Sequence, residues 1–123
     1  MPTILVVDDT EANRQILSLR LTREGFQVVT ASNGAEAVNA AASNSPALIL
    51  MDIDMPVMNG LEATRALKSN PATAHIPVIS LTANNDPEIR EQCLAAGCSD
   101  YEPKPLDFPR LLGKVKALLS TAG

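Results

Sequence analysis

The chain has 123 residues, enough for one folded domain, and 46% of them are hydrophobic, which excludes an intrinsically disordered protein. A net charge of −4 argues against a nucleic-acid-binding protein, because contacts to phosphate need a basic surface. No apolar stretch is long enough to cross a membrane, and no secretory signal precedes the first apolar run, so we expect a cytoplasmic protein.

Short apolar runs alternate along the chain with segments of helical periodicity. They predict strands at 4–7, 26–31, 47–51, 77–81 and 100–103, the last being the least apolar. Between and after them we expect helices over 11–24, 34–43, 60–69, 87–96 and 107–119. Such alternation is typical of an α/β protein with a parallel sheet, in which buried strands are continuous apolar runs.

Most of the predicted helices have an apolar face. The residues expected to face the sheet are Ile16, Leu17 and Leu21 in the first helix, Val38, Ala41 and Ala42 in the second, Leu61, Thr64 and Leu67 in the third, and Phe108, Leu111, Leu112, Val115, Leu118 and Leu119 in the last. The fourth helix is marked by its start, where Asp86 is an N-cap followed by Pro87.

The expected topology follows from the handedness of the connections. Parallel strands joined by helices need right-handed crossovers, which leaves few arrangements for five strands. We expect a flavodoxin-like three-layer (βα)5 fold with a five-stranded parallel sheet in the order 2-1-3-4-5. In this order the first and third strands are neighbours at the point where the strand order reverses, which is where open α/β sheets bind their ligands.

Four of the five predicted strands lead into polar side chains. Asp8 and Asp9 follow the first strand, Asp52 the third, Thr82 the fourth and Lys104 the last. Because the carboxyl ends of parallel strands meet at one edge of the sheet, we expect these side chains to line a single crevice.

These residue types point to metal-dependent phosphoryl transfer. Three carboxylates that lie close together repel unless a cation joins them, and Mg²⁺ prefers oxygen ligands of this kind. Asp52 would be the nucleophile, Lys104 would neutralise one oxygen of the transferred group, and the Thr82 hydroxyl would bind another. We expect Asp8 and Asp9 to be metal ligands rather than acid–base catalysts.

The single histidine and the two cysteines suggest no second site. His75 falls in a predicted loop, where a surface or structural role is expected. Cys93 and Cys98 match neither a redox nor a zinc pattern, and we expect both to be small core residues.

At these positions the chain resembles the bacterial response-regulator receiver domain, over about residues 3–119. The motifs that carry the resemblance are Val6-Val7-Asp8-Asp9, Met51-Asp52-Ile53-Asp54-Met55-Pro56-Val57-Met58-Asn59-Gly60, Leu81-Thr82-Ala83 and Tyr101-Glu102-Pro103-Lys104-Pro105. The resemblance implies that Asp52 accepts a phosphoryl group from a histidine kinase or a phosphotransfer protein. It also implies that Asp9, Asp52 and the backbone carbonyl of Asp54 bind Mg²⁺ directly, and that Asp8 acts through water.

The resemblance assigns further roles around the phosphoacceptor. Thr82 would move toward the phosphoryl group, and Tyr101 would swing inward behind it as a switch residue. Lys104 would pair with a phosphoryl oxygen, and its peptide bond to Pro105 would be cis. Ala83 would leave room for the donor.

Two positions near the site are ones that vary among receiver domains. Asp54 and Asn84 each lie two positions past a site residue and would modulate the lifetime of the phosphoryl group by steering the attacking water.

Structural interpretations exist for several of these residues. Asp8 and Asp9 would suit the start of the first helix as caps. Tyr101 would be a half-buried core aromatic, and Lys104 by itself would be an ordinary surface lysine. Asp52 is harder to explain in this way, because a carboxylate directly after an apolar strand needs a partner inside the crevice.

The leading hypothesis is a single receiver domain over 1–123 with no output domain. It would not be an enzyme beyond self-catalysed phosphoryl uptake and slow autodephosphorylation. It would be a monomer that signals by protein contact, through the face made by the last two helices and the last strand. It would bind neither nucleic acid nor membrane.

Two alternatives remain open from the sequence. One is a receiver fragment of a hybrid kinase or of a larger regulator. The other is a phosphatase of the DxD type, in which Asp52 and Asp54 are nucleophile and general acid. The second is weaker, because such enzymes usually carry this motif after their first strand and have cap insertions that this short chain lacks.

Overall fold

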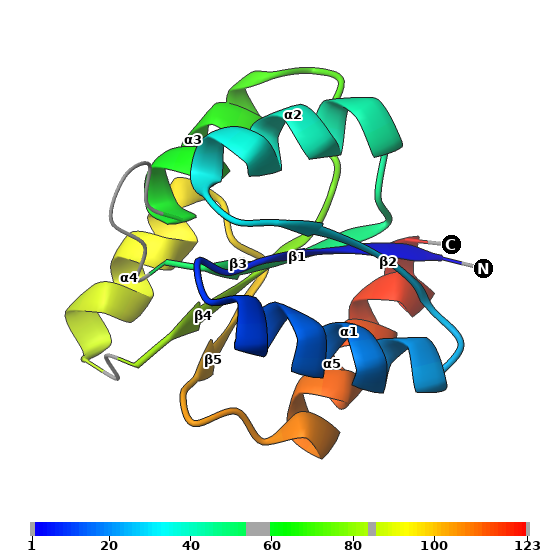
Figure 1. Ribbon diagram of the computed structural model, residues 1–123. Coiled ribbons are helices and arrows are strands. Elements are labelled where there is room, and N and C mark those ends of the chain that lie inside the picture. The colour runs from blue at the N-terminus through cyan, green and yellow to red at the C-terminus, as the bar shows by residue number, and fades with distance from the viewer. Residues whose placement is uncertain (1, 54–59, 84–85, 123) are drawn as a thin grey trace.

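The computed structural model describes residues 2–53, 60–83 and 86–122. Within these ranges strands and helices alternate along the whole chain (Figure 1). The elements are β1 (Thr3–Val7), α1 (Glu11–Arg23), β2 (Gln27–Ala31), α2 (Gly34–Asn44), β3 (Leu48–Asp52), α3 (Gly60–Ser69), β4 (Val78–Thr82), α4 (Pro87–Ala96), β5 (Asp100–Pro103) and α5 (Phe108–Ala122).

The strands form one parallel sheet in the order β2-β1-β3-β4-β5, which confirms the predicted fold class and strand order. The register aligns the carboxyl ends of the central strands: Val7 of β1 pairs with Met51 of β3, and Asp52 of β3 with Leu81 of β4. All five strands therefore finish at the same edge of the sheet, which is the edge that holds the polar residues.

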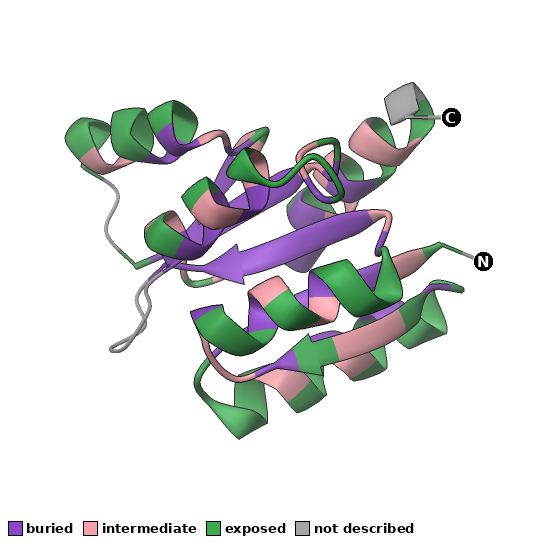
Figure 2. Ribbon diagram, turned by 90° about the horizontal axis from the view of Figure 1, so that it is seen from above, coloured by how far each residue is buried: buried purple, intermediate pink, exposed green. Residues whose placement is uncertain are grey.

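Helices cover both faces of the sheet and create two separate cores. Residues of α2, α3 and α4 pack with one face, and residues of α1 and α5 with the other. Figure 1 shows α2 and α3 on one side of the sheet and α1 and α5 on the opposite side. Figure 2 shows the buried middle of the sheet: β3 and β4 are buried along their whole length, whereas β2 at the edge is partly exposed.

The predicted apolar faces are correct for most positions and wrong for two. Ile16 is 56% exposed although it was expected to face the sheet, because its neighbours Leu17 and Leu21, one turn apart, occupy the inner face of α1. Ala42 is likewise exposed, and the buried positions of α2 are Gly34, Ala37 and Ala41. Small alanine side chains give little signal about which side of a helix faces inward.

Element boundaries differ slightly from those predicted. Asp52 and Thr82 are the last residues of β3 and β4 rather than the residues after them. The start of α4 is as expected, with the Asp86 side chain accepting a hydrogen bond from the Glu88 N–H. Cys93 and Cys98 are buried free thiols, which agrees with their expected role as core residues. Within the described residues, no helix combines the length and apolar character needed to cross a bilayer.

Candidate functional site

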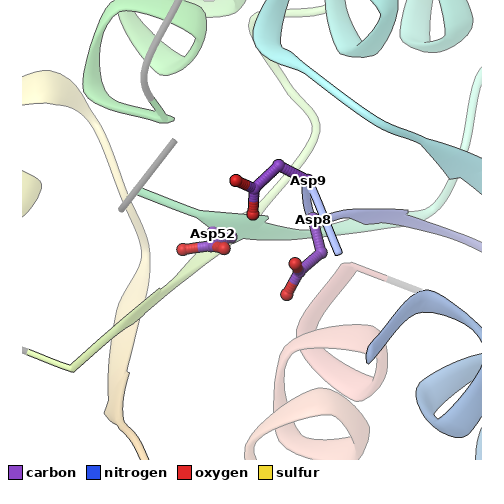
Figure 3. A group of neighbouring side chains, drawn as sticks. All are labelled: Asp8, Asp9 and Asp52. Atoms are coloured by element: carbon purple, nitrogen blue, oxygen red, sulfur yellow. The ribbon is translucent and has the colours of Figure 1, made fainter. Parts of the chain in front are cut away.

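Three aspartates meet at the carboxyl ends of β1 and β3. Asp8, Asp9 and Asp52 each place a carboxylate oxygen within 4.8 Å of the others. Figure 3 shows the three side chains gathered at this edge of the sheet. Asp8 and Asp52 are each only 2% exposed, whereas Asp9 faces solvent. We call these three residues the acidic cluster.

The sheet itself brings the acidic cluster together. β1 and β3 are hydrogen-bonded neighbours, so residues that follow Val7 lie beside residues that follow Met51. The chain on both sides is held by backbone bonds: the Asp8 N–H donates to the Ala31 carbonyl at 3.1 Å, and the Ile53 N–H to the Leu81 carbonyl at 3.0 Å. The positions of Asp8 and Asp52 therefore follow from the strand order and do not depend on a flexible connection.

Asp8 is oriented by the first turn of α1. Its carboxylate accepts hydrogen bonds from the Thr10 N–H at 2.8 Å and from the Asn13 side-chain amide at 3.3 Å. The Arg14 guanidinium donates to the backbone carbonyl of Asp8 at 2.7 Å. The N-cap of α1 is Thr10, whose side chain makes no cap bond, so the interpretation of Asp8 and Asp9 as helix caps is wrong; Asp8 instead accepts from the N–H that precedes the helix.

Lys104 points into the same crevice from the other side. Its ammonium lies 3.1 Å from a carboxylate oxygen of Asp52, and its backbone N–H donates to the Thr82 carbonyl at 2.7 Å. The peptide bond from Lys104 to Pro105 is cis. Lys104 is therefore not a solvated surface lysine: its side chain is 23% exposed and is paired with the buried carboxylate of Asp52.

Of the remaining predicted site residues, three lie within the described ranges and two lie outside them. Thr82 is fully buried at the end of β4, Tyr101 is 8% exposed and packs in the core on the α4 side, and Ala83 is exposed beside them. Asp54 and Asn84, the two residues expected to modulate phosphoryl lifetime, lie outside the described residues.

Gly60 is needed where α3 begins, beside the acidic cluster. A Cβ atom at this position would lie 2.6 Å from the Asp52 carbonyl oxygen and 2.6 Å from the Ile53 side chain. These distances are shorter than real contacts, so any larger residue would displace the end of β3. The sequence placed Gly60 only in a motif, and no sequence signal revealed this packing requirement.

A cavity of about 290 Å³ opens between α1 and the segment that follows β5. Asp8 and Lys104 form one end of it, and Ile16, Arg20 and Phe108 line its walls. The Arg20 guanidinium lies 4.3 Å from the centre of the Phe108 ring, which is a cation–π distance. Asp8 is the member of the acidic cluster that lines this cavity, whose wall is partly apolar.

Sequence analysis missed a buried carboxylate on β5. Glu102 is fully buried and forms ion pairs with Arg110 at 2.6 Å and with Lys114 at 2.9 Å, both from α5. The hydrogen bond to Glu102 raises the pKa of the Arg110 guanidinium. Arg110 and Lys114 are four positions apart and so share a face of α5, but this spacing does not show which strand residue they meet.

The chemistry of the acidic cluster is that of a site for a hard divalent cation. Carboxylates this close repel one another unless positive charge lies between them. Oxygen ligands from a few carboxylates are what Mg²⁺ uses in proteins. Lys104 adds a fixed positive charge next to Asp52, where it would stabilise a further anionic group.

Comparison with known proteins supports this description. The family model of the response regulator receiver domain matches residues 4–116. The chain is 44% identical over 115 residues to the response regulator PleD of Caulobacter vibrioides, which covers 94% of this chain and 25% of PleD. The chain therefore spans about a quarter of the length of that relative.

Two further proteins are similar over nearly their whole length. The polar-differentiation response regulator DivK of Brucella anthropi is 35% identical over 120 residues, covering 98% of each chain. The crystal structure of the receiver domain of the sensor histidine kinase PA1611 from Pseudomonas aeruginosa superimposes with a TM-score of 0.89 at 33% identity, covering 97% of this chain and 98% of that one. That structure has a magnesium ion coordinated in its active site cleft.

Proposed function

Because the chain belongs to the response regulator receiver domain family of two-component systems, we propose that Asp52 is its phosphoacceptor and that phosphorylation requires Mg²⁺. Domains of this family act in signalling rather than as dedicated enzymes. One observation carries the proposal: the carboxylate of Asp52 is buried between two other carboxylates within 4.8 Å and an ammonium at 3.1 Å. A buried carboxylate in these surroundings is suited to a metal ion and a phosphoryl group.

The donor set fits Mg²⁺. Asp9 and Asp52 would bind the ion directly together with the backbone carbonyl of Asp54, and Asp8 would act through water. The hydrogen bonds from Thr10 and Asn13 hold Asp8 in place for that role. When bound, Mg²⁺ offsets the repulsion within the acidic cluster and supplies positive charge to the phosphoryl oxygens.

The chemical step uses Asp52 as the nucleophile. A carboxylate oxygen of Asp52 bonds to the phosphorus of a phosphohistidine as the P–N bond breaks, and the electron pair of that bond returns to the imidazole nitrogen. The product is an acyl phosphate on Asp52. The ammonium of Lys104 binds one phosphoryl oxygen, and the hydroxyl of Thr82 approaches another.

The donor would be a histidine kinase or a phosphotransfer protein. Access is consistent with a macromolecular donor, because Ala83 is small and exposed beside the site. The cavity next to Asp8 and Lys104 offers the exposed Ile16 as an apolar contact.

Output would occur through α4, β5 and α5. Thr82 is the last residue of β4, and Tyr101 lies on the neighbouring strand β5. A conformational change at phosphorylated Asp52 would therefore be transmitted through β4 and β5 to α4 and α5, the helices that follow these strands. Leu94 of α4 is 50% exposed on this side and is available for a protein target. Phosphorylation would act by favouring one of two existing conformations, each with a different affinity for that target.

Phosphorylation by a small donor tests the proposal. The protein is incubated with ³²P-labelled acetyl phosphate in Mg²⁺ or in EDTA, and incorporated label is measured for the wild type and for Asp52→Asn. We expect label only in the wild type with Mg²⁺. Asp86→Asn is the matched control, because Asp86 is an exposed aspartate outside the acidic cluster whose capping role asparagine preserves.

The outcomes separate clearly. Loss of label in Asp52→Asn with full label in Asp86→Asn supports the proposal. Label that persists in Asp52→Asn, or that is indifferent to EDTA, contradicts it.

A further inference from the structure

Glu102 is a buried charge that the proposed phosphorylation chemistry does not use. It alternates with Tyr101 along β5, so the two side chains lie on opposite faces of the sheet. Tyr101 packs in the core on the α4 side, whereas Glu102 pairs with Leu81, a residue of the core on the α5 side. A carboxylate that is 0% exposed in an apolar layer is costly unless cations and hydrogen bonds satisfy it.

α5 supplies those cations from two successive turns. The Arg110 guanidinium donates to the two oxygens of Glu102 at 2.6 Å and 3.2 Å, and the Lys114 ammonium donates to one of them at 2.9 Å. Lys114 also donates to the backbone carbonyl of Tyr101 and lies 3.7 Å from Asp100. Glu102, Arg110 and Lys114 thus join β5 to α5; we call them the β5–α5 clasp.

The clasp encloses the segment that carries Lys104. Between Glu102 and Arg110 the chain runs through Lys104 and then through Asp107, whose side chain accepts from the Arg110 N–H at 3.2 Å. The ion pair between Glu102 and Arg110 therefore closes a ring across this segment. Both ends of the segment are held by the clasp, while Lys104, two residues after Glu102, extends to Asp52 at 3.1 Å.

We propose that Glu102 is a positioning residue for phosphorylation: through Arg110 and Lys114 it holds the Lys104 segment so that the Lys104 ammonium stays beside Asp52. This inference rests on the proposed function of Asp52. Phosphoryl transfer depends on charge placement, and a displacement of about 1 Å can lower a rate by roughly a hundredfold. Glu102 does not touch the reacting atoms, and its effect passes entirely through Lys104.

A double-mutant cycle isolates that route. The rate of labelling by acetyl phosphate at saturating Mg²⁺ is measured for the wild type, Glu102→Gln, Lys104→Ala and the double variant, and each rate is divided by the folded fraction from circular dichroism. We expect Glu102→Gln to slow labelling roughly tenfold in the wild-type background and to change nothing in the Lys104→Ala background. Magnesium affinity, measured by calorimetry, should stay unchanged in Glu102→Gln, because the acidic cluster does not include Glu102.

Hydrogen exchange gives a second readout that does not need labelling. The Lys104 N–H donates to the Thr82 carbonyl, and its exchange should be faster in Glu102→Gln than in the wild type. The Ile53 N–H, which donates to Leu81 on the other side of β4, is the internal control: its exchange reports any global loss of stability, and the exchange of Lys104 should accelerate by more than that of Ile53.

Glu24→Gln is the matched control variant. It removes an ion pair between an exposed glutamate and Lys116 of α5 at 3.7 Å, far in sequence from Lys104. Its labelling rate should equal that of the wild type.

Each outcome bears on the inference. Equal rates for Glu102→Gln and the wild type, or an equal slowing in both backgrounds, would overturn it. If the wild type itself takes no label, the proposed function fails instead, and an acceleration of Lys104 exchange greater than that of Ile53 in Glu102→Gln would still support the positioning role.

Discussion

Two buried carboxylates of this chain have opposite surroundings. Glu102, fully buried on β5, faces the guanidinium of Arg110 at 2.6 Å and the ammonium of Lys114 at 2.9 Å. Asp52, 2% exposed at the end of β3, pairs with Lys104 at 3.1 Å but has carboxylate oxygens of two other aspartates within 4.8 Å.

The difference separates a charge that the protein already stabilises from one that is suited to binding an ion. In the β5–α5 clasp two cations surround one anion, so the group is already stabilised by the protein. In the acidic cluster three anions share a crevice, and their repulsion decreases only when a cation binds or a carboxylate is neutralised. Burial of a charge is common to both regions, and the sign of the neighbouring charges decides which of them is suited to binding an ion.

The largest expected effect comes from removing the cations of the clasp. Arg110→Met combined with Lys114→Met leaves the Glu102 carboxylate buried without a partner, so the free energy of unfolding should fall by about 3–5 kcal/mol. Adding Glu102→Leu should restore most of that loss, because a buried ion pair and an apolar replacement of similar size are often equally stable. Urea denaturation of the three forms measures both effects. A double variant as stable as the wild type would show that the carboxylate does not depend on these cations.

A pair of isosteric substitutions should change stability in opposite directions. In EDTA, Glu102→Gln should lower the free energy of unfolding by about 2 kcal/mol, because charge-assisted hydrogen bonds to Arg110 and Lys114 are lost. Asp52→Asn should raise it by about 1 kcal/mol, because like-charge repulsion within the acidic cluster is relieved. The midpoint of urea denaturation, measured for each variant and for the wild type in EDTA, gives the direction of each change. A decrease in both variants would mean that Lys104 already compensates the cluster.

The glycines beside the two regions should also behave differently. Gly60→Ala forces a Cβ atom to within 2.6 Å of the Asp52 carbonyl, so we expect a loss of about 1–3 kcal/mol and a weaker affinity for Mg²⁺. Gly113→Ala, in α5 between Arg110 and Lys114, meets nothing within 4 Å and should stabilise the helix by about 0.5–1 kcal/mol. Thermal unfolding and magnesium titration check both variants. Equal effects at the two positions would contradict the close packing at Gly60.

The fold was largely predictable because its signals are local. The strands and helices appear at the predicted places, with most boundaries shifted by only one or two residues. Asp8, Asp9, Asp52 and Lys104 could be assigned to one crevice before the structure was known, because parallel strands end at a common edge. No comparable local signal distinguished Ile16, which is exposed, from its buried neighbour Leu17.

The clasp could not be predicted in this way. Glu102 lies in a short strand with little apolar periodicity, and its burial depends on where α5 lies over the sheet. Arg110 is 53% exposed, so a helical pattern alone would assign it to the solvent face. The packing requirement at Gly60 is of the same kind, because it involves contacts with the end of β3, a different element of the fold.

By itself the sequence determined the order of the elements, the handedness of their connections and the edge of the sheet at which polar side chains gather. Those properties arise from the repeat of the backbone and from chirality, which act within short stretches of chain. Only the tertiary structure decided that Glu102 is buried and paired with Arg110 and Lys114, and that Gly60 packs against the end of β3. Burial and charge pairing depend on elements that are distant in sequence, and their energies are set by which groups the packing brings within a few ångströms.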